Sequence, residues 1–342
     1  MMETKIIHPE QIEEAVEAIK KGELISFPTE TVYGLGADAT NEKAVKQVYQ
    51  AKGRPSDNPL IVHISKVEQV LNFTNEFSET AQKLADAFWP GPLTLIFDLK
   101  NKEVLPSAVT GGLTTAAFRM PNNELTLSLI EKSGKVLVGP SANTSGLPSP
   151  TTAQHVYHDL VGKIYGVLDG GACQVGVEST VLDLTSEVPT ILRPGAITLQ
   201  QIQTVIGNVQ IDQHIMSEKE APKAPGMKYK HYSPETPVMM IDKENKDWQE
   251  AIDWYLGQKK RVGILANDEI ISKLIGYQES FSLSKTRDIS EAMRHLFAGL
   301  RALDTKEKNL DIILAESYEE KDEGLAYMNR LKKASNQKKY QK

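Results

Sequence analysis

The chain has 342 residues, of which 40% are apolar and 25% are charged, and its formal net charge is −6 at pH 7. This is an ordinary globular composition, and the length predicts two domains. The acidic balance argues against a protein that coats DNA or RNA, because such proteins are usually basic. The single cysteine, Cys173, excludes an internal disulfide and a thiolate zinc cluster, and it fits a reducing compartment.

The first residues lack the apolar core of a signal peptide, and no apolar run approaches the roughly 20 residues that a bilayer-spanning helix needs. We therefore expect a cytoplasmic protein with no membrane partner.

The first part of the chain alternates helical and strand-like segments. Apolar residues at helical spacing predict helices over 9–21, from about Asn41 and over 78–88, and 150–152 offers an N-cap for another. The expected strands are 24–27, 60–64, 93–99, 114–120, 135–138, 164–168, 179–184 and 190–192. Polar loops, such as 28–39 and 139–146, repeatedly follow strand ends, where α/β sheets place ligands. Residues 1–206 are thus expected to form a mixed α/β domain.

The character of the chain changes after residue 206. Residues 207–236 have the composition of a linker whose end is rich in Lys, Tyr and His. From 237 the order strand, helix, strand, helix predicts a small doubly wound domain. Its expected strands are 238–241, 262–265 and 312–315, and its expected helices lie near 248–256, 268–275, 290–303 and beyond the last strand. The Lys-rich end after Lys332 is expected to be a frayed tail.

Two cations, Lys52 and Arg54, stand on either side of Gly53, just after the second expected helix. On a loop stiffened by Gly and Pro, the planar fork of Arg and the point charge of Lys form an anion clamp. A solvated charged turn is the commoner meaning of such a pair. Further strand-end groups that could hold a nucleotide are Arg119, Arg193, Ser141, Asn143 and residues 228–232.

Several patterns resemble known chemistry but lack a required feature. Residues 34–39 match G-x-G-x-x-A, yet 28–33 separate them from the preceding strand, and no Walker motif occurs. Residues 139–143 nearly match a nucleophile elbow, but Asn143 replaces its second glycine and Ser141 has no evident His–acid pair. His155, His158 and Asp159 lack a further metal ligand and are expected on an exposed helix face. Cys173 is most simply a small buried residue.

Four ordered segments carry a resemblance to one family. Residues 27–36 (FPTETVYGLG), 52–55 (KGRP), 140–146 (PSANTSG) and 178–181 (ESTV) are similar to motifs of the YrdC-type threonylcarbamoyl-AMP synthases. The segment 225–234 (PGMKYKHYSP) and the domain after it resemble the long, two-domain branch. The resemblance covers nearly the whole chain.

The resemblance implies a twisted mixed α/β sheet with a concave cavity over residues 1–206. It also implies a linker or flap over the active site at 207–236 and a small Rossmann-like doubly wound domain at 237–342. The family condenses L-threonine, bicarbonate and ATP into threonylcarbamoyl-AMP and pyrophosphate. Mg²⁺ would arrive with the ATP, with no metal ligand from protein side chains. A downstream transferase complex would then modify tRNA, and the chain would itself make a weak contact with tRNA or other RNA.

The family's functional residues carry over onto matching positions of this sequence. Lys52 and Arg54 would be the catalytic cations. L-Threonine would be bound by Thr31, His63, Arg119, Gly139 and Ser179. ATP would be bound by Lys52, Arg54, Asn58, Thr115, Ser141, Asn143, Ser149, Arg193, His231 and Tyr232. Two positions depart from the pattern, since many members have Ala in place of Gly139 and a small aliphatic residue in place of Phe118.

Two alternatives remain open from the sequence. One is a protein that binds tRNA or double-stranded RNA in a basic cavity, against which the net charge argues. The other is carbamoyl transfer in metallocentre maturation, which uses a related domain. That activity also needs zinc-finger and acylphosphatase modules, and a single cysteine excludes the zinc finger.

Overall fold

The computed structural model describes residues 3–56, 58–212, 232–241 and 248–340. It divides into two compact units, each described by itself below. The N-terminal unit comprises residues 1–145, 150–174 and 178–228, and the C-terminal unit comprises 146–149, 175–177 and 229–342.

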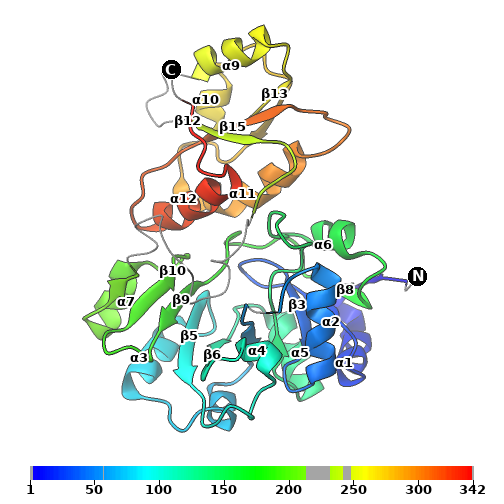
Figure 1. Cartoon of the computed structure of the whole chain (residues 1–342), viewed down its shortest axis with the longest axis vertical. Helices are drawn as coiled ribbons and strands as arrows, with labels where there is room; N and C mark the ends of the chain where they lie inside the picture. Colours follow the sequence, from blue (N-terminus) through cyan, green and yellow to red (C-terminus); the bar gives the residue numbers. More distant parts are fainter. Residues whose placement is uncertain (1–2, 57, 213–231, 242–247, 341–342) are drawn as a thin grey trace. The chain divides into compact units, whose positions relative to one another are not determined.

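An eleven-stranded mixed sheet forms the N-terminal unit, in the order β1-β8-β2-β3-β7-β4-β6-β5-β9-β10-β11 (Figure 1). Its strands are β1 Lys5–Ile7, β2 Ile25–Phe27, β3 Gly34–Asp38, β4 Ile61–His63, β5 Leu93–Asp98, β6 Thr115–Arg119, β7 Leu137–Val138, β8 Gly166–Leu168, β9 Thr180–Asp183, β10 Thr190–Arg193 and β11 Gln210–Ile211. The sheet contains both parallel and antiparallel pairs; β4 pairs parallel with β6 and antiparallel with β7. The predicted mixed α/β sheet is confirmed.

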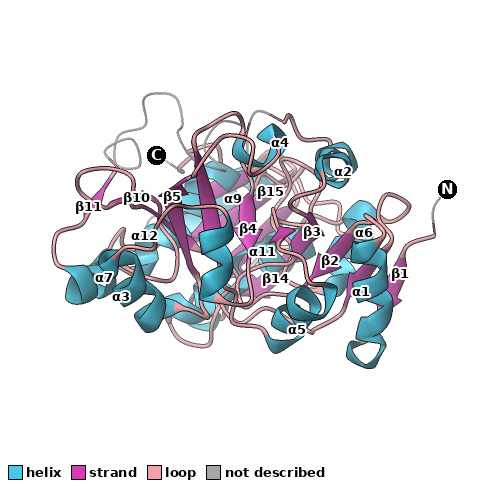
Figure 2. Ribbon diagram, turned by 90° about the horizontal axis from the view of Figure 1, so that it is seen from below, coloured by secondary structure: helices cyan, strands magenta, loops and turns pink. Residues whose placement is uncertain are grey.

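Helices cover the two faces of this sheet. They are α1 Ile12–Lys20, α2 Glu42–Lys52, α3 Glu79–Phe88, α4 Ser107–Thr110, α5 Glu124–Ser133, α6 Ala153–Leu160 and α7 Leu199–Ile206, with 3₁₀ turns at Pro9–Gln11 and Val67–Asn72. Helix α1 packs against α5, and α3 packs against α7 (Figure 2). The side chains of Asn41 and Thr152 cap α2 and α6, as expected for these residue types.

The apolar core lies on both faces of the sheet because successive side chains of a strand point to opposite faces. In β4, Val62 belongs to the largest apolar cluster, whereas Ile61 belongs to a second one with Ala117. In β2, Ile25 and Phe27 join a third cluster under α1 and α5. The short strands that carry the polar loops are therefore held rigidly from both sides.

The segment 34–38 corrects the sequence-based expectation of a long polar loop over 28–39. Gly34–Asp38 forms β3, which pairs antiparallel with β2 so that Ile25 lies opposite Gly36. Glycine has a low strand propensity, which is why the pattern indicated a loop. A Cβ atom at Gly36 would lie 2.8 Å from the ring of Phe27, so the strand approaches its neighbour closely here. Strand β1 and helices α5 and α7 were also not anticipated.

The C-terminal unit is a parallel four-stranded sheet in the order β12-β15-β13-β14. Its strands are β12 Val238–Ile241, β13 Val262–Ala266, β14 Glu279–Ser282 and β15 Ile312–Glu316, and its helices are α9 Trp248–Gly257, α10 Asp268–Ile271, α11 Ile289–Leu303 and α12 Glu323–Ala334. Parallel strands connected by helices confirm the predicted Rossmann-like arrangement. Within the described residues, no helix is long and apolar enough to cross a membrane.

Two details of this unit differ from expectation. The edge strand β14 was missed because three of the four residues of its sequence, ESFS, are polar. The end of the chain is not a frayed tail as far as residue 340. The backbone N–H of Met240 in β12 donates to the carbonyl of Lys338 at 3.0 Å, and the N–H of Tyr340 donates to the carbonyl of Met240 at 2.9 Å.

Candidate active site

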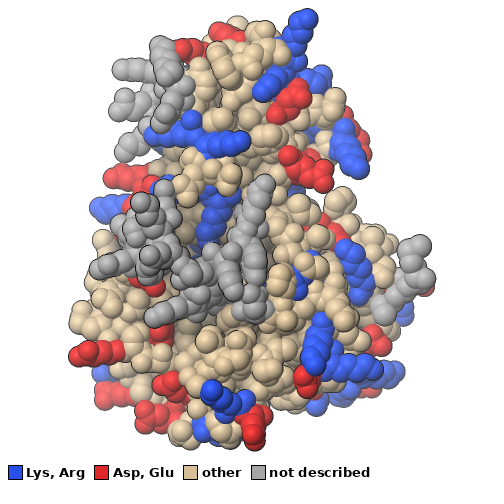
Figure 3. All heavy atoms as spheres, in the orientation of Figure 1, with Lys and Arg blue, Asp and Glu red and all other residues tan. Residues whose placement is uncertain are grey.

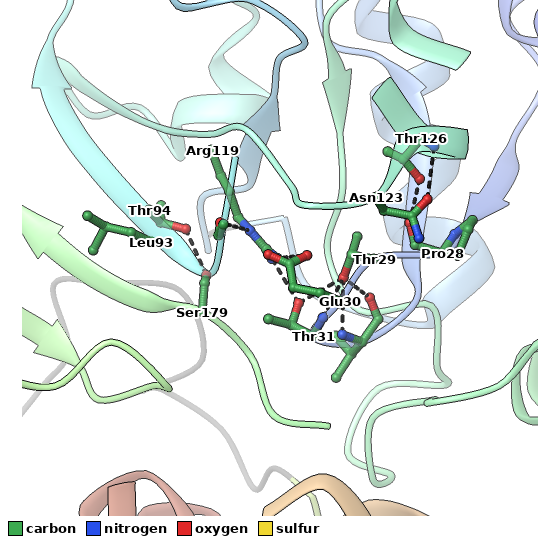
Figure 4. A network of polar contacts seen from close by, with 12 residues as sticks. Pro28, Thr29, Glu30, Thr31, Leu93, Thr94, Arg119, Asn123, Thr126 and Ser179 are labelled. Carbon is green, nitrogen blue, oxygen red and sulfur yellow. Dashed lines mark hydrogen bonds and ion pairs between the residues drawn. The ribbon is translucent and has the colours of Figure 1, made fainter. Parts of the chain in front are cut away.

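A tight polar turn follows β2 and places the first group of predicted site residues. The hydroxyl of Thr29 accepts from the backbone N–H groups of Thr31 and Val32, at 3.1 and 3.2 Å, and donates to the carbonyl of Val32 at 2.6 Å. Such a turn is a known role of threonine side chains. It fixes Glu30 and Thr31 so that both side chains meet Arg119 (Figure 4).

Arg119 ends β6 and is only 4% exposed. Its Nη1 donates to the hydroxyl of Thr31 at 2.9 Å, its Nε donates to the carbonyl of Gly91 at 3.3 Å, and its Nη2 lies 2.6 Å from Oε2 of Glu30. The guanidinium is thus held on three sides by groups that accept hydrogen bonds or carry negative charge. This gives the turn after β2 and the end of β6 a common polar centre.

His63 lies opposite Arg119 in the register of β4 and β6. Burial, with the neighbouring Arg119 charge as a second cause, lowers the pKa of His63 to about 3. The ring is therefore neutral at physiological pH, and it packs edge-on against Phe27 at 5.3 Å between centroids. A Cβ atom at Gly139 would lie 2.5 Å from Nδ1 of His63. The imidazole can therefore occupy this position only because residue 139 has no side chain.

Ser179, directly before β9, is hydrogen-bonded to Thr94 of β5 and to Arg193 of β10. Its hydroxyl lies 2.7 Å from the hydroxyl of Thr94. Arg193 at the end of β10 donates from Nη2 to the Ser179 hydroxyl and from Nε to the Ser179 carbonyl, each at 3.0 Å. Arg193 is only 7% exposed, so its side chain is built into the sheet edge rather than solvated.

Lys52, Ser141 and Asn143 come together as one group. Lys52 is the last residue of α2 and is 3% exposed. Its Nζ donates to the carbonyl of Ser141, to the carbonyl of Asn143 at 2.9 Å and to the Asn143 side-chain oxygen at 3.4 Å. The backbone N–H of Ser145 donates in turn to the carbonyl of Lys52 at 2.8 Å. The loop after β7 is therefore wrapped around the lysine.

Arg54 and Asn58 also lie together. Nη2 of Arg54 donates to the carbonyl of Asn58 at 3.3 Å, and its guanidinium carbon lies 5.9 Å from the centre of the Tyr49 ring. The hydroxyl of Tyr49 donates to the same carbonyl at 2.8 Å. Thr115, the first residue of β6, lies opposite Asp98 of β5 and is half-buried.

Three predicted ATP ligands fall outside this group. Ser149 and Tyr232 belong to the C-terminal unit, where the Tyr232 ring packs against Phe297 with 5.1 Å between centroids. His231 lies outside the described residues. Their contact with ATP stays a prediction.

The sequence-based inventory missed Glu30, Thr94 and Asp159. Glu30 lies inside the motif 27–36, so its position was visible but its partner was not. Asp159 was expected on an exposed helix face, but its side chain is fully buried. Its Oδ2 accepts from the backbone N–H of Thr144 at 3.1 Å, which anchors the loop around Lys52.

Two negative expectations concern metal and thiol chemistry. Among the described residues there is no group of three or more His, Cys, Asp or Glu side chains that could hold a metal ion. Cys173 is 4% exposed, and burial raises the pKa of its thiol to about 12, which keeps it protonated. Its interpretation as a small buried residue is confirmed.

Known proteins resemble this chain over almost its full length. The Sua5–YciO–YrdC family, described as telomere recombination, matches residues 17–195, and the C-terminal domain of threonylcarbamoyl-AMP synthase matches 197–336. Threonylcarbamoyl-AMP synthases of Pyrococcus abyssi and Bacillus subtilis are 47% and 45% identical, each over 95% of this chain and over 96% and 93% of their own lengths. The structure of P. abyssi Sua5 with L-threonine has a TM-score of 0.91 and 45% identity, and covers 99% of this chain and 100% of that one. A variant of the same protein with a His and a Tyr replaced by Ala has a TM-score of 0.89 at 44% identity, over 98% of this chain and 97% of that one. This chain belongs to the two-domain Sua5 type of the threonylcarbamoyl-AMP synthase family.

Proposed function

We propose that this chain is an L-threonylcarbamoyladenylate synthase, which condenses L-threonine, bicarbonate and ATP into threonylcarbamoyl-AMP and pyrophosphate. Two relatives that cover nearly all of it bear the name of this activity, and one solved relative holds L-threonine. The observation that carries the proposal is the buried polar centre at Arg119, with Thr31 bonded to it and His63 opposite it in the sheet. Such a centre suits a small substrate that has both a carboxylate and a hydroxyl.

The proposed reaction needs no nucleophile from the protein. The amine of threonine adds to CO₂ or bicarbonate and gives N-carboxy-threonine. The new carboxylate attacks the α-phosphorus of ATP, and the bond to the bridging oxygen breaks as pyrophosphate leaves. Positioning of the reactants alone can remove about 7–11 kcal/mol of barrier. The protein therefore acts by holding substrates and by neutralising charge.

Lys52 and Arg54 are the cations proposed to lie against the phosphates. Lys52 donates to the backbone carbonyl of Asn143 and Arg54 donates to that of Asn58, so protein contacts already orient both side chains. The polar set of Ser141, Asn143, Asn58, Thr115, Ser149, Arg193, His231 and Tyr232 would complete the ATP site. Mg²⁺ would be held by the phosphates of ATP, where it would supply charge neutralisation.

Threonine would be recognised by Thr31, His63, Arg119, Gly139 and Ser179. The fork of Arg119 suits the substrate carboxylate. Neutral His63 can hydrogen-bond a hydroxyl or an amine without repelling it. A site that hydrogen-bonds a hydroxyl strongly rejects an analogue without one, so serine should compete better than valine.

The domain division is also proposed as 1–206, 207–236 and 237–342, with 207–236 acting as a flap that closes over ATP and excludes water. Most of this segment, residues 213–231, lies outside the described residues. Deletion of 228–234 should abolish adenylate formation, and unchanged turnover would refute the flap. The product would pass to a downstream transferase that modifies tRNA, and the protein would act in the cytoplasm.

RNA binding as the main activity is not favoured. On the face that Figure 3 shows, the described Lys and Arg side chains are mixed with Asp and Glu over both units rather than gathered in one basic field. The net charge of −6 agrees with this. Electrostatic attraction to phosphate backbones needs clustered positive charge.

The test is pyrophosphate release from ATP with L-threonine, L-serine or L-valine, each with and without bicarbonate. The proposal predicts release that requires bicarbonate and falls in the order threonine, serine, valine. Release that ignores both threonine and bicarbonate would refute it.

A further inference from the structure

The side chain of Glu30 is buried without enough partners for its charge. It is 7% exposed, Oε1 has no hydrogen-bond partner among the described residues, and Oε2 has only the Arg119 contact at 2.6 Å. An ionised carboxylate has about four acceptor positions. Burying a charge costs several kcal/mol unless it is well paired, so an incompletely paired buried carboxylate indicates a ligand.

The partner of Glu30 also has capacity left. Two of the five N–H groups of the guanidinium donate hydrogen bonds, to Gly91 and Thr31, and Nη2 faces Glu30 at 2.6 Å without hydrogen-bond geometry. Nη2 accordingly has no hydrogen-bond acceptor among the described residues, so the guanidinium keeps donors for a further carboxylate. The pair therefore offers free donors on a cation next to free acceptors on an anion.

Two titratable groups that interact with this pair, His63 and Cys173, are uncharged. His63 is uncharged because burial and the Arg119 charge hold its pKa at about 3. Cys173, whose thiol senses the charges of both Glu30 and Arg119, is protonated because its pKa is raised to about 12. One fixed positive and one fixed negative charge side by side are the complement of a zwitterionic α-amino acid.

We propose that Glu30 binds the α-ammonium group of the amino-acid substrate while Arg119 binds its α-carboxylate. The proposal rests on the proposed function and adds to it the group that recognises the amine. Glu30 is then a substrate-binding residue rather than a support for Arg119. Glu30 would also fix the position of the amine, which is the group that must react with bicarbonate.

The alternative role, in which Glu30 only positions Arg119, makes a different prediction. A supporting residue would affect every ligand that uses Arg119. An ammonium-binding residue would affect only ligands with an amine. (R)-3-Hydroxybutanoate separates the two roles, because it keeps the carboxylate and hydroxyl of L-threonine and lacks the amine.

The experiment measures the Kd of L-threonine by titration calorimetry and that of (R)-3-hydroxybutanoate by displacement, on the full chain. Glu30→Gln keeps the size of the side chain and removes its charge. We expect this variant to raise the Kd of L-threonine at least about tenfold, as for loss of a charged hydrogen bond. The Kd of the analogue should stay within about twofold of its wild-type value. Glu30→Asp keeps the charge but moves it back by one methylene. It should raise the Kd of threonine selectively in the same way, and it replaces the first variant if that one does not fold.

The matched control is Asp38→Asn. Asp38 is likewise buried, at 6% exposure, and pairs with Lys135 at 2.9 Å, but it lies at the far end of β3. This variant should leave both Kd values unchanged. The inference would be overturned if the Glu30 variants lost affinity equally for both ligands, or if they lost no affinity for threonine. In either case, threonine binding by the wild type would still support the proposed function. Failure of the wild type to bind threonine would overturn both.

Discussion

The side-chain Nζ of Lys52 lies 2.9 Å from the backbone carbonyl oxygen of Asn143, a residue 91 positions further along the chain. The same ammonium group donates to the carbonyl of Ser141. Lys52 is therefore structural as well as charged: it holds the loop after β7 in shape. Hydrogen bonds to neutral oxygens leave the ammonium charge in place, so the lysine can order the loop and still attract a phosphate.

Lys52→Ala should abolish turnover and also destabilise the fold. It removes a proposed phosphate cation, which is expected to lower kcat at least about 100-fold. It also leaves buried carbonyls unpaired, which should lower the free energy of unfolding by about 1–3 kcal/mol. Pyrophosphate release and urea unfolding measure the two effects. Lys46→Ala is the control, because Lys46 lies on the same helix and its side chain is 60% exposed. Within the described residues, its ion pair is with Glu42. Full activity in Lys52→Ala would contradict the proposed site.

Gly139→Ala should weaken threonine binding more than ATP binding. The added Cβ would stand 2.5 Å from Nδ1 of His63 and 2.7 Å from the ring of Phe27, so one of these rings must move. We expect the KM for threonine to rise by about tenfold, in line with a displaced hydrogen-bonding group. Gly257→Ala is the control, since its Cβ would meet nothing within 4 Å. An unchanged KM for threonine would contradict the prediction that the added Cβ displaces a substrate-binding His63.

His63 should make the fold less stable in acid. Its pKa is about 3 in the folded chain, below the ordinary value of 6.5, because it is buried and next to Arg119. Between those pH values the unfolded chain binds a proton that the folded chain does not, so stability is lost as pH falls from about 6.5 toward 3. The slope that this residue contributes is at most about 1.4 kcal/mol per pH unit. Urea unfolding at pH 4.5, 5.5 and 6.5 should show a smaller slope in His63→Gln than in the wild type. An equal slope in both would refute this origin.

Asp159→Ala should loosen the loop that Lys52 holds. Asp159 accepts the backbone N–H of Thr144 at 3.1 Å from a fully buried position. Its removal leaves that N–H without this acceptor, which should cost about 1–3 kcal/mol of stability. The KM for ATP should rise several-fold while the KM for threonine stays near its wild-type value. His158→Ala, at the adjacent and largely exposed position, should change neither. Equal effects on both substrates would argue against a specific role in the ATP loop.

Local signals predicted much of the fold. The N-cap at Asn41 and the glycine at 53 delimit α2 correctly, because capping depends on neighbouring residues only. Strand β3 was missed because its glycines are tolerated only by close packing against Phe27, a tertiary effect. The pairing of the chain end with Met240 was missed for a similar reason, since a Lys-rich segment has no local strand signal.

The candidate site shows the same limit. The resemblance selected Lys52, Ser141 and Asn143, and the structure brings them into contact. The ion pair between Glu30 and Arg119 joins the turn after β2 to the end of β6, and no spacing rule indicates it. Sequence reasoning finds the motif that contains Glu30, whereas only the folded chain shows which charge it faces.

The most direct test of the proposed activity follows the carbon of bicarbonate. The full chain is incubated with ATP, L-threonine and ¹³C-labelled bicarbonate, and the AMP-linked product is analysed at once by mass spectrometry. The account predicts an adenylate that contains both threonine and one ¹³C atom in its carbamoyl group. An adenylate that contains threonine without the label would mean that the enzyme activates the amino acid's own carboxylate, and it would contradict the account.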